Sequence, residues 1–561
     1  MNHPRQGIKN IPYICAQLGM KYVIITPGSR NAPLIISFNQ EKSIECLSIT
    51  DERSAAYFAL GISQVTGNPV GLVCTSGTAV LNFGPAIAEA FYQYLPLVIF
   101  TADRPPELID QADGQTIRQF EVFKNHVKKS FSLPVETSTD PDLWFSNRII
   151  SEAIGIATES PSGPVHINVP LREPLYDKLP ELSDNLKVIQ SVSTQPEFSE
   201  SIFEKLLVKW QHIEKKMIVA GFNYYNPDLN RLLGKLSDEK SVVIIAENLS
   251  NSANVKFIHS PEKFFAALKE NEKEKFRPEL LITIGNSVVS KRLKQYLRKF
   301  RPAEHWNIST GYEYIDTYQC LTLNLKLNPG KFFEKLLSSG SVTISGKDFA
   351  GLYHDKAQVT DKKHDMYMKQ APFSDLKAFE QITYSLPSGT NLHLANSTPV
   401  RYAQLFKSRE DIEYFGNRGT SGIDGCISTA AGSAYASDKP TVIVAGDLAF
   451  IYDSNALWNN HLSGKLKIIV INNGGGNIFT LIETSPEINA VRNFFETPHR
   501  VNLKQLTSAF EVKYFFCNDG EGLKTGLNNL FSTKEPAVLE IKTDSKTDTL
   551  VFKEYYSHLK K

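Results

Sequence analysis

The chain has 561 residues, enough for about three or four domains of ordinary size. Its 61 basic and 60 acidic side chains nearly cancel, which excludes a role built mainly on binding nucleic acid or an anionic membrane surface. The six cysteines form no CxxC pair and no Cys/His ligand pattern, and no stretch is apolar for long enough to be a signal peptide or to cross a bilayer. These features predict a cytoplasmic protein with no membrane part, no disulfide framework and no zinc site.

Short apolar, β-branched runs alternate with helical stretches, a pattern typical of parallel strands buried on both faces. In the first third of the chain the runs are 21–28, 69–77, 96–105 and 163–170, with helices at 53–67 and 78–94. Two further sets of runs are 216–223, 241–250 and 279–287, and then 441–450, 466–476 and 537–544.

Strands that alternate with helices predict open parallel sheets. Residues 171–200, rich in Pro, Ser, Glu and Asp, read as a linker, and the polar stretch around 340–375 reads as a helical or extended connector. The sequence therefore predicts an α/β fold with three doubly wound parallel-sheet domains. Their predicted bounds are 1–180, 195–345 and 370–561.

Two successive strands of the third set end in groups that suit a cation. Gly446-Asp447-Leu448 ends one run and Asn472-Asn473-Gly474-Gly475 ends the next, and the segment DSNALWNNHL between them reads as a helix. Ligands bind beyond the carboxyl ends of parallel strands, so a carboxylate and an amide are presented to one point. Mg²⁺ takes hard oxygen ligands of this kind beside a phosphate group. The alternative interpretation is that both segments are only strand-ending turns.

This pair of segments resembles the motif of the thiamine-diphosphate enzyme superfamily, in which GD is followed after a spacer by NN. The resemblance implies that thiamine diphosphate is the cofactor and that Gly446 and Leu448 contact it. It also implies that Asp447, Asn473 and the backbone carbonyl of Gly475 bind Mg²⁺, with Mn²⁺ as an alternative. Leu448 stands where many members have Gly, but it is not one of the ligating groups.

Glu52 follows the apolar run CLSIT and precedes a predicted helix, so it lies at a strand end. A Glu in an apolar pocket keeps its proton, because desolvation raises its pKa, and it can then donate a hydrogen bond. The alternative is an acid that only stabilises the helix N-terminus. The resemblance implies that Glu52 activates a cofactor whose diphosphate is bound by a partner subunit, in a homodimer or homotetramer. It also places Ile423, in the glycine-rich GTSGIDG segment, as the hydrophobic support of the bent cofactor.

Basic side chains stand near several predicted strand ends, within TPGSRN, TADRPP, SKR, ANSTPVR and GNRGTSG. Each alone reads as a solvated surface charge. Together they favour a pocket for substrates with several carboxylates, because Arg binds carboxylates through paired hydrogen bonds.

A narrower resemblance rests on the segments TPGSRNAPL, DERSAAYFALG, TSGTAVLNFGPAIAEA, TADRPPEL, GNRGTSGIDG, GDLAFIYDSNAL and NNGGGNIF. With them the sequence resembles the 2-succinyl-5-enolpyruvyl-6-hydroxy-3-cyclohexene-1-carboxylate synthases of menaquinone biosynthesis. The resemblance implies that 2-oxoglutarate is decarboxylated and that the succinyl carbanion adds 1,4 to isochorismate.

The same resemblance assigns roles to individual residues. It implies that Glu52, Ser29, Arg30 and Gln115 are catalytic. Substrate contacts are implied for Arg30, Arg104, Gln115, Lys291, Arg292, Arg401, Arg418 and Ile482, and further cofactor contacts for Ser397, Ile478 and Phe479. Ile478, Phe479 and Ile482 would form an apolar wall that favours decarboxylation.

Two other classes of protein remain as alternatives. The first is another thiamine-dependent 2-oxo acid decarboxylase or carboligase. Simple decarboxylases often carry a His-His pair, and none of the twelve histidines here adjoins another. The second is a nucleotide-binding or non-enzymatic α/β protein, which predicts a GxGxxG turn or a P-loop that the sequence lacks.

Overall fold

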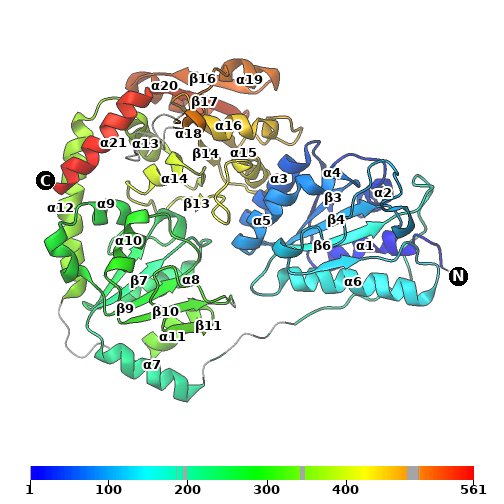
Figure 1. The fold of residues 1–561 in the computed structure, drawn as a ribbon, viewed down its shortest axis with the longest axis horizontal. Helices are drawn as coiled ribbons and strands as arrows, with labels where there is room; N and C mark the ends of the chain where they lie inside the picture. The colour runs from blue at the N-terminus through cyan, green and yellow to red at the C-terminus, as the bar shows by residue number, and fades with distance from the viewer. Residues whose placement is uncertain are drawn as a thin grey trace.

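The computed structural model describes residues 2–561 except 185, 193, 195, 196, 198, 312, 341–347, 477–490 and 492. The described strands form three sheets in which every recorded pairing is parallel. Helices lie on both faces of each sheet (Figure 1). The predicted α/β fold with three doubly wound parallel sheets is therefore confirmed.

The N-terminal sheet has the strand order β2-β1-β3-β4-β6-β5. Its strands are β1 (Tyr22–Ile25), β2 (Glu45–Ser48), β3 (Val70–Cys74), β4 (Leu97–Asp103), β5 (Ser130–Ser132) and β6 (Val165–Pro170). Its helices are α1 (Gln6–Gln17), α2 (Ala32–Gln40), α3 (Glu52–Thr66), α4 (Thr78–Asn82), α5 (Gly84–Gln93) and α6 (Asp140–Thr158). Every residue of β3, β4 and β6 is buried, which explains why these strands read as unbroken apolar runs in the sequence.

The central sheet has the order β11-β10-β9-β7-β8. Its strands are β7 (Lys216–Ala220), β8 (Val242–Ala246), β9 (Leu280–Ile284), β10 (Glu304–Ser309) and β11 (Leu323–Lys326). Its helices are α7 (Glu200–His212), α8 (Pro227–Leu236), α9 (Pro261–Ala266), α10 (Lys291–Lys299) and α11 (Pro329–Ser338). The long helix α12 (Phe349–Gln370) then leads to the third sheet.

The C-terminal sheet has the order β13-β12-β14-β15-β17-β16. Its strands are β12 (Asn391–Leu394), β13 (Glu413–Phe415), β14 (Thr441–Gly446), β15 (Leu466–Asn472), β16 (Lys513–Cys517) and β17 (Ala537–Lys542). Its helices are α13 (Asp375–Ser385), α14 (Thr398–Ala403), α15 (Cys426–Ala436), α16 (Asp447–Tyr452), α18 (Asn493–Glu496), α19 (Leu503–Ala509), α20 (Gly520–Ser532) and α21 (Ser545–Lys560). The prediction of a helix over DSNALWNNHL is wrong. Helix α16 ends at Tyr452, and only the 3-10 turn Ser454–Leu457 follows within that segment.

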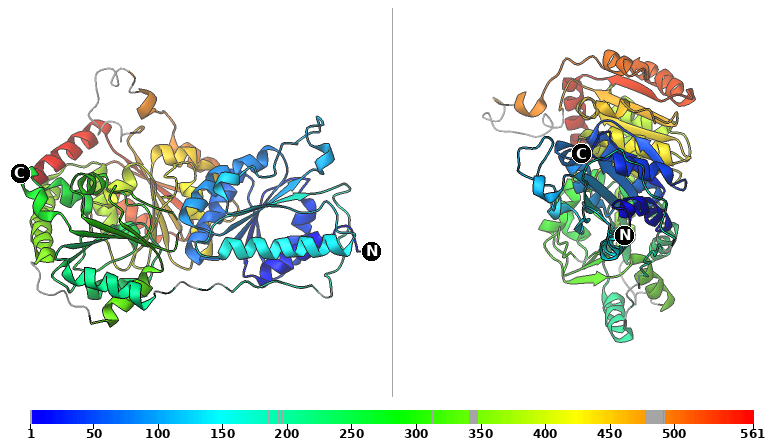
Figure 2. Two further views of the ribbon diagram at one scale, coloured as in Figure 1. Left: turned by 60° about the horizontal axis from the view of Figure 1, so that its bottom comes forward. Right: turned by 90° about the vertical axis from the view of Figure 1, so that its right-hand side faces the viewer.

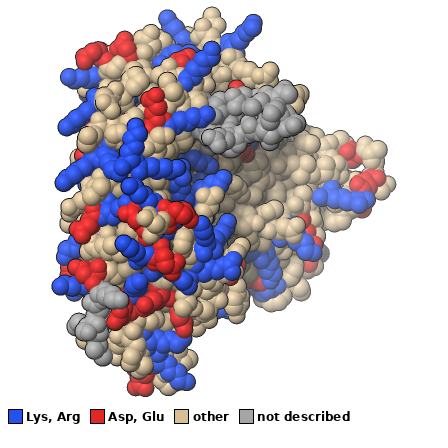
Figure 3. Space-filling model, turned by 60° about the vertical axis from the view of Figure 1, so that its left-hand side comes forward, with Lys and Arg blue, Asp and Glu red and all other residues tan. Residues whose placement is uncertain are grey.

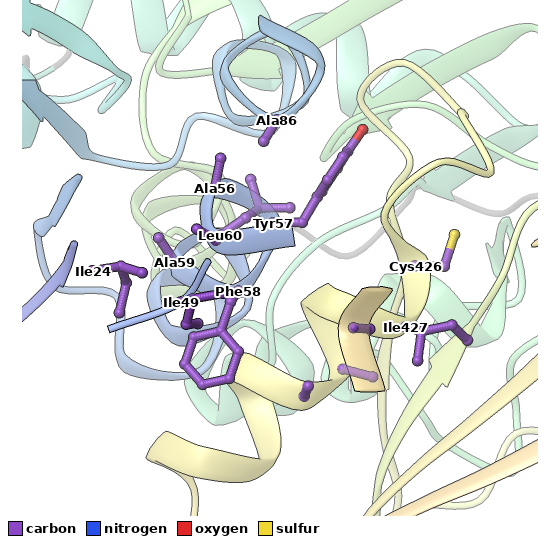
Figure 4. Close-up of a cluster of buried hydrophobic side chains, with 14 of the residues drawn as sticks. Ile24, Ile49, Ala56, Tyr57, Phe58, Ala59, Leu60, Ala86, Cys426 and Ile427 are labelled. Carbon is purple, nitrogen blue, oxygen red and sulfur yellow. The ribbon is translucent and has the colours of Figure 1, made fainter. Parts of the chain in front are cut away.

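The first and third sheets have the same topology. Strands β12 to β17 take, one for one, the places that β1 to β6 take in the N-terminal sheet. Consequently α3, which follows β2, and α15, which follows β13, occupy equivalent positions. These two helices pack against each other, and their apolar side chains belong to one continuous core that joins the two sheets (Figure 4).

Two glycines allow this close helix packing. A Cβ at Gly61 of α3 would lie 1.9 Å from the carbonyl oxygen of Thr429, and a Cβ at Gly432 of α15 would lie 1.9 Å from that of Phe58. The two contacts mirror each other, because each glycine lies three residues after the carbonyl that the other helix approaches. Only glycine permits such an approach of the two backbones.

The N-terminal and C-terminal sheets lie side by side with the central sheet below the latter, and the two chain ends lie at opposite sides of the molecule (Figure 1). The described residues between β6 and α7 run along the outside of the molecule, where the sequence predicts a linker (Figure 2). Helix α12 lies beside α21, to which Lys363 and Tyr367 are hydrogen-bonded. Among the described residues, no helix combines the length and the apolar character needed to cross a membrane.

Candidate active site

The first part of the candidate site is a cavity of about 440 Å³ at the carboxyl ends of β1, β2 and β3, lined by residues between Pro27 and Ile117. Glu52 lines it from the first turn of α3, where Asp51 caps the helix by accepting a hydrogen bond from the Ser54 N–H at 2.8 Å. Burial raises the pKa of Glu52, backbone hydrogen bonding lowers it, and the neighbouring Asp51 raises it. The net direction is upward, and the side chain faces the cavity.

Two buried arginines lie at the same edge of the sheet. Arg104 follows β4, and its Nη1 donates to Ser76 Oγ at 3.0 Å and to the Gln115 carbonyl at 3.3 Å. Ser76 and Gln115 both line the Glu52 cavity. Arg30 donates from Nη1 to the Leu171 carbonyl at 3.0 Å.

Ser29 and the Gln115 side chain are exposed, and Gln115 has a positive φ of 54°. Arg104 also forms an ion pair with Asp113, a further residue of the cavity wall. The structure therefore places Glu52 and Gln115 in the wall of one cavity, and Arg104 lies behind that wall, hydrogen-bonded to Ser76 and Gln115.

The second part lies at the ends of β14 and β15, which are neighbours in the C-terminal sheet. Asp447 begins α16 and is 2% exposed. Its Oδ2 accepts hydrogen bonds from the Gly474 N–H at 2.8 Å and the Gly475 N–H at 2.9 Å. The carboxylate and the loop that contains Asn473 are therefore adjacent.

The residues of this second part fit a magnesium diphosphate group. Carboxylate, amide and carbonyl oxygens are the ligands that Mg²⁺ prefers. A Cβ at Gly446 or Gly474 would meet no atom within 4 Å, so the space beside both glycines is open to a ligand. Gly474 and Gly475 have φ values of 89° and 154°, which a residue with a side chain rarely adopts.

His499 is a neighbour of Asp447 that the sequence analysis did not identify. Its Nε2 lies 3.1 Å from Asp447 Oδ2. Burial raises the pKa of Asp447, while the hydrogen bonds from His499 and from the backbone lower it. No local sequence pattern marks His499, because it lies 52 positions after Asp447, within an irregular segment.

A third group consists of basic side chains from the central and C-terminal sheets. Arg292 on α10 forms a 2.9 Å ion pair with Glu262, whose charge also acts on Arg401 of α14. Arg418, in the loop after β13, donates from Nη1 to Asn396 Oδ1 at 2.6 Å, and Arg401 is among the charges that act on it. Lys291 is exposed at the start of α10.

Figure 3 shows Lys and Arg side chains gathered on this face of the molecule, beside a hollow. Ser397 precedes α14 with a positive φ of 77°. Ile423 is half-buried and packs against the core that α3 and α15 share. The expected apolar wall of Ile478, Phe479 and Ile482 lies outside the described residues.

The acid Glu52 and the candidate metal ligand Asn473 line different cavities of one chain. Glu52 lines a cavity formed by residues between Pro27 and Ile117. Asn473 lines another cavity, formed by residues between Asn473 and Thr549.

Comparisons with known proteins define the class first. Residues 6–122 match the family model "Thiamine pyrophosphate enzyme, N-terminal TPP binding domain", and residues 397–541 match "Thiamine pyrophosphate enzyme, C-terminal TPP binding domain". The chain is therefore a thiamine pyrophosphate enzyme, and the predicted cofactor is confirmed. The predicted alternative of a nucleotide-binding or non-enzymatic α/β protein is wrong.

Full-length relatives define the family. A 2-succinyl-5-enolpyruvyl-6-hydroxy-3-cyclohexene-1-carboxylate synthase of Flavobacterium johnsoniae is 40% identical, over 100% of both chains. The synthase of Flavobacterium psychrophilum is 41% identical over 98% of both chains. That of Porphyromonas gingivalis is 38% identical over 99% of this chain and 97% of its own. The chain belongs to the 2-succinyl-5-enolpyruvyl-6-hydroxy-3-cyclohexene-1-carboxylate synthase family, and the predicted resemblance is confirmed.

Proposed function

We propose that this enzyme decarboxylates 2-oxoglutarate and adds the resulting four-carbon unit 1,4 to isochorismate. The product is 2-succinyl-5-enolpyruvyl-6-hydroxy-3-cyclohexene-1-carboxylate, and the reaction is a step of menaquinone biosynthesis. Family membership supports this reaction. The observation that carries it is the position of Glu52 and Gln115 in the wall of one cavity of the N-terminal sheet, with Arg104 hydrogen-bonded to Ser76 and Gln115 of that wall. If the enzyme were another thiamine-dependent decarboxylase, its substrate would lack the several carboxylates that the arginines of the candidate site could bind.

Bound thiamine diphosphate supplies the nucleophilic carbon and the electron sink that decarboxylation requires. Glu52 would bind the aminopyrimidine end, and the burial that raises its pKa is in the direction that favours donation of a hydrogen bond to a ring nitrogen. Ile423 would support the bent cofactor, with Ser397, Gly446 and Leu448 as further contacts. Ile478 and Phe479 remain predicted contacts.

Asp447, Asn473 and the Gly475 carbonyl would bind Mg²⁺, or Mn²⁺, at the diphosphate. The adjacency of Asp447 to the Gly474–Gly475 backbone supports this assignment. The ion would neutralise diphosphate charge in a place where the protein offers oxygen ligands.

The arginines would bind and orient two anionic substrates. Arg30 and Arg104 are held by backbone carbonyls and side chains of the N-terminal sheet, so their guanidinium groups are fixed in direction. Ser29 and Gln115 would complete this part. Lys291, Arg292, Arg401 and Arg418 would bind carboxylates from the other part, with Ile482 as a predicted apolar contact.

A complete site would form between two chains. Glu52 and Asn473 line different cavities of one chain, which supports a site in which one copy supplies the acid and a second copy supplies the metal ligands. A homodimer or homotetramer follows, with residues 1–180 binding the pyrimidine, 195–345 forming the central domain and 370–561 binding the diphosphate. A cytoplasmic location stays a prediction from the six free cysteines.

Product analysis tests the proposal. The purified enzyme with thiamine diphosphate and Mg²⁺ receives 2-oxoglutarate with and without isochorismate. We expect the adduct only when both substrates are present, and its absence would contradict the proposed function. Glu52→Gln keeps the size of the side chain but removes the acid, and we expect it to lower kcat by at least about a hundredfold, the usual size of an acid–base contribution. Glu41→Gln changes a half-buried acid in the turn between α2 and β2 that does not line the cavity, and it is the matched control, for which we expect unchanged turnover.

A further inference from the structure

Glu89 on α5 is a fully buried carboxylate whose two oxygens are directed at one loop of the C-terminal sheet. Its Oε1 accepts a hydrogen bond from the Gly419 N–H at 2.6 Å. Its Oε2 accepts from the Thr420 N–H at 2.7 Å and from the Thr420 hydroxyl at 2.5 Å. Three donors of two consecutive residues therefore converge on one side chain from the N-terminal sheet.

Gln93, one helical turn after Glu89, extends the same contact. Its Nε2 donates to Glu89 and to the Gly416 carbonyl, the latter at 3.1 Å. Its Oε1 accepts from Gln64 and from the hydroxyl of Tyr224 in the central region, both at 2.9 Å. Gln93 is 1% exposed, so these bonds are shielded from water.

The loop held in this way carries two proposed site residues. Arg418 immediately precedes Gly419, and Ile423 follows three residues after Thr420. On its other side the loop is held by Asn396, whose Nδ2 donates to the Gly422 carbonyl at 2.6 Å and whose Oδ1 accepts from Arg418 at 2.6 Å. A Cβ at Gly419 would lie 2.7 Å from the Glu89 carbonyl, so the loop lies directly on α5.

We propose that Glu89 is a positioning residue that fixes the loop 416–423, and with it Arg418 and Ile423, for the active site to which this loop belongs. The inference rests on the proposed function, in which each site takes Glu52 from one chain and the loop from another. All contacts of Glu89 with the loop lie within one chain. Glu89 therefore acts on a different active site from the Glu52 of its own chain, although both lie on helices of the same sheet.

Substitution of Glu89 by Gln tests the role directly. The amide replaces one acceptor oxygen by a donor that faces the loop N–H groups. Because hydrogen bonds to a charged acceptor are the stronger kind, we expect kcat/KM for isochorismate to fall about tenfold to a hundredfold. The Kd for thiamine diphosphate should rise as Ile423 loses its fixed position.

Glu45→Gln is the matched control. Glu45 also crosses from the N-terminal to the C-terminal sheet, where it accepts a hydrogen bond from Tyr435, but it does not touch the loop. A similar loss in Glu45→Gln would show that any weakening of the sheet contact impairs the enzyme, and it would overturn the positioning role. Unchanged kinetics in Glu89→Gln would overturn it as well.

Mixed assemblies provide a test that general destabilisation cannot imitate. Glu52→Gln and Glu89→Gln chains are co-expressed in equal amounts and compared with each variant alone. If the proposal holds, about one quarter of the sites in a random mixture of chains pair an intact Glu52 with an intact loop, and turnover rises to about one quarter of wild type.

The opposite result is equally distinct. If Glu89 served the site of its own Glu52, every site with an intact Glu52 would carry the Glu89→Gln substitution. The mixture would then show only the mean of the two parent variants, and the proposal would fail. This failure differs from failure of the proposed function, which would appear as absence of adduct in the wild-type enzyme.

Thr420→Val serves as the second variant if Glu89→Gln does not fold. Thr420 is exposed, and the substitution removes only the hydroxyl that donates to Glu89. We expect a smaller loss of kcat/KM in the same direction, and the same restoration when it is co-expressed with Glu52→Gln. Wild-type kinetics in Thr420→Val would contradict the proposal.

Discussion

At the scale of single residues, three acidic side chains show how surroundings decide what a carboxyl group does. Glu52 faces a cavity, and its partial burial raises its pKa. Asp447 accepts hydrogen bonds from the backbone of a glycine loop, which suits an ionised ligand. Glu89 is fully buried, and donors of the loop contact both of its oxygens. The proposed roles of proton donor, metal ligand and positioning residue thus go with three different surroundings.

A buried pair of aspartates predicts how stability depends on pH. Asp375 of α13 donates its backbone N–H to Asp548 Oδ1 at 2.8 Å, and both side chains are buried. Burial, and then the charge of Asp548, raises the pKa of Asp375 well above 3.8, and burial raises the pKa of Asp548 to about 6. The folded chain therefore holds a proton that the unfolded chain has already released.

Since the folded state binds more protons, the free energy of unfolding falls as pH rises from about 4 to about 7. Asp375→Asn keeps the shape and removes one charge of the pair. We expect its melting temperature to fall less over that range than that of the wild type, and Asp365→Asn, at an exposed position on α12, to follow the wild type. If the melting temperatures of the wild type and of Asp375→Asn fell in parallel over this pH range, the claim that the aspartate pair holds a proton in the folded chain would be contradicted.

Residues at strand ends could be found from the sequence, but residues that act across sheets could not. Glu52 and Asp447 each follow an apolar run, and this local pattern marks them. Glu89 lies within a helix, and its partner Gly419 is 330 positions away. No periodicity or turn signal in the chain indicates such a contact, because it arises only when two sheets pack together.

At the scale of elements, α3 and α15 join the two sheets that have equal topology. Their N-terminal turns are also linked, because the Ser54 and Ser428 hydroxyls lie 2.8 Å apart and Asp453 accepts from the Ser428 N–H at 2.7 Å. Glu52 begins α3, and Ile423 shortly precedes α15. The packing of this helix pair therefore fixes the direction of both site residues.

Gly432→Ala should separate this helix pair. The added Cβ would lie 1.9 Å from the Phe58 carbonyl, which is backbone and cannot turn aside. We expect a loss of about 1–3 kcal/mol in the free energy of unfolding, the usual cost of overpacking, measured by denaturant titration. Gly155→Ala, in α6, meets only Ser191 at 3.6 Å and should be neutral or slightly stabilising. Equal stability of the two variants would contradict the role of Gly432.

The sequence predicts the elements that are long and fully buried, and it misses those that depend on their neighbours. Strands β4 and β15 are buried along their whole length, and both were predicted as apolar runs. Strand β5 has three residues and β13 has three, too few to form a recognisable run, so neither was predicted. The segment after α16 fails as a helix because Asp453 turns back to bind Ser428 instead of continuing the helix.

At the scale of the whole molecule, the central sheet is bonded to the C-terminal one. Asn248 Nδ2 donates to the Ala403 carbonyl at 2.9 Å, and Asn251 Nδ2 to the Tyr414 carbonyl at 2.8 Å. These bonds place Arg292 and Arg401 near the shared Glu262. The central and C-terminal sheets thus build one basic surface, while the N-terminal sheet carries Glu52.

The proposed division of the site between chains predicts that activity depends on protein concentration. On dilution below the dissociation constant of the assembly, each chain keeps its folded sheets but loses the other part of its site. We expect turnover per chain to fall in step with dissociation measured by analytical ultracentrifugation, while far-UV circular dichroism stays constant. Thiamine diphosphate with Mg²⁺ would contact both chains, so excess cofactor should shift the fall to lower protein concentration. Turnover per chain that stays constant while the assembly dissociates would show that a single chain contains the whole site.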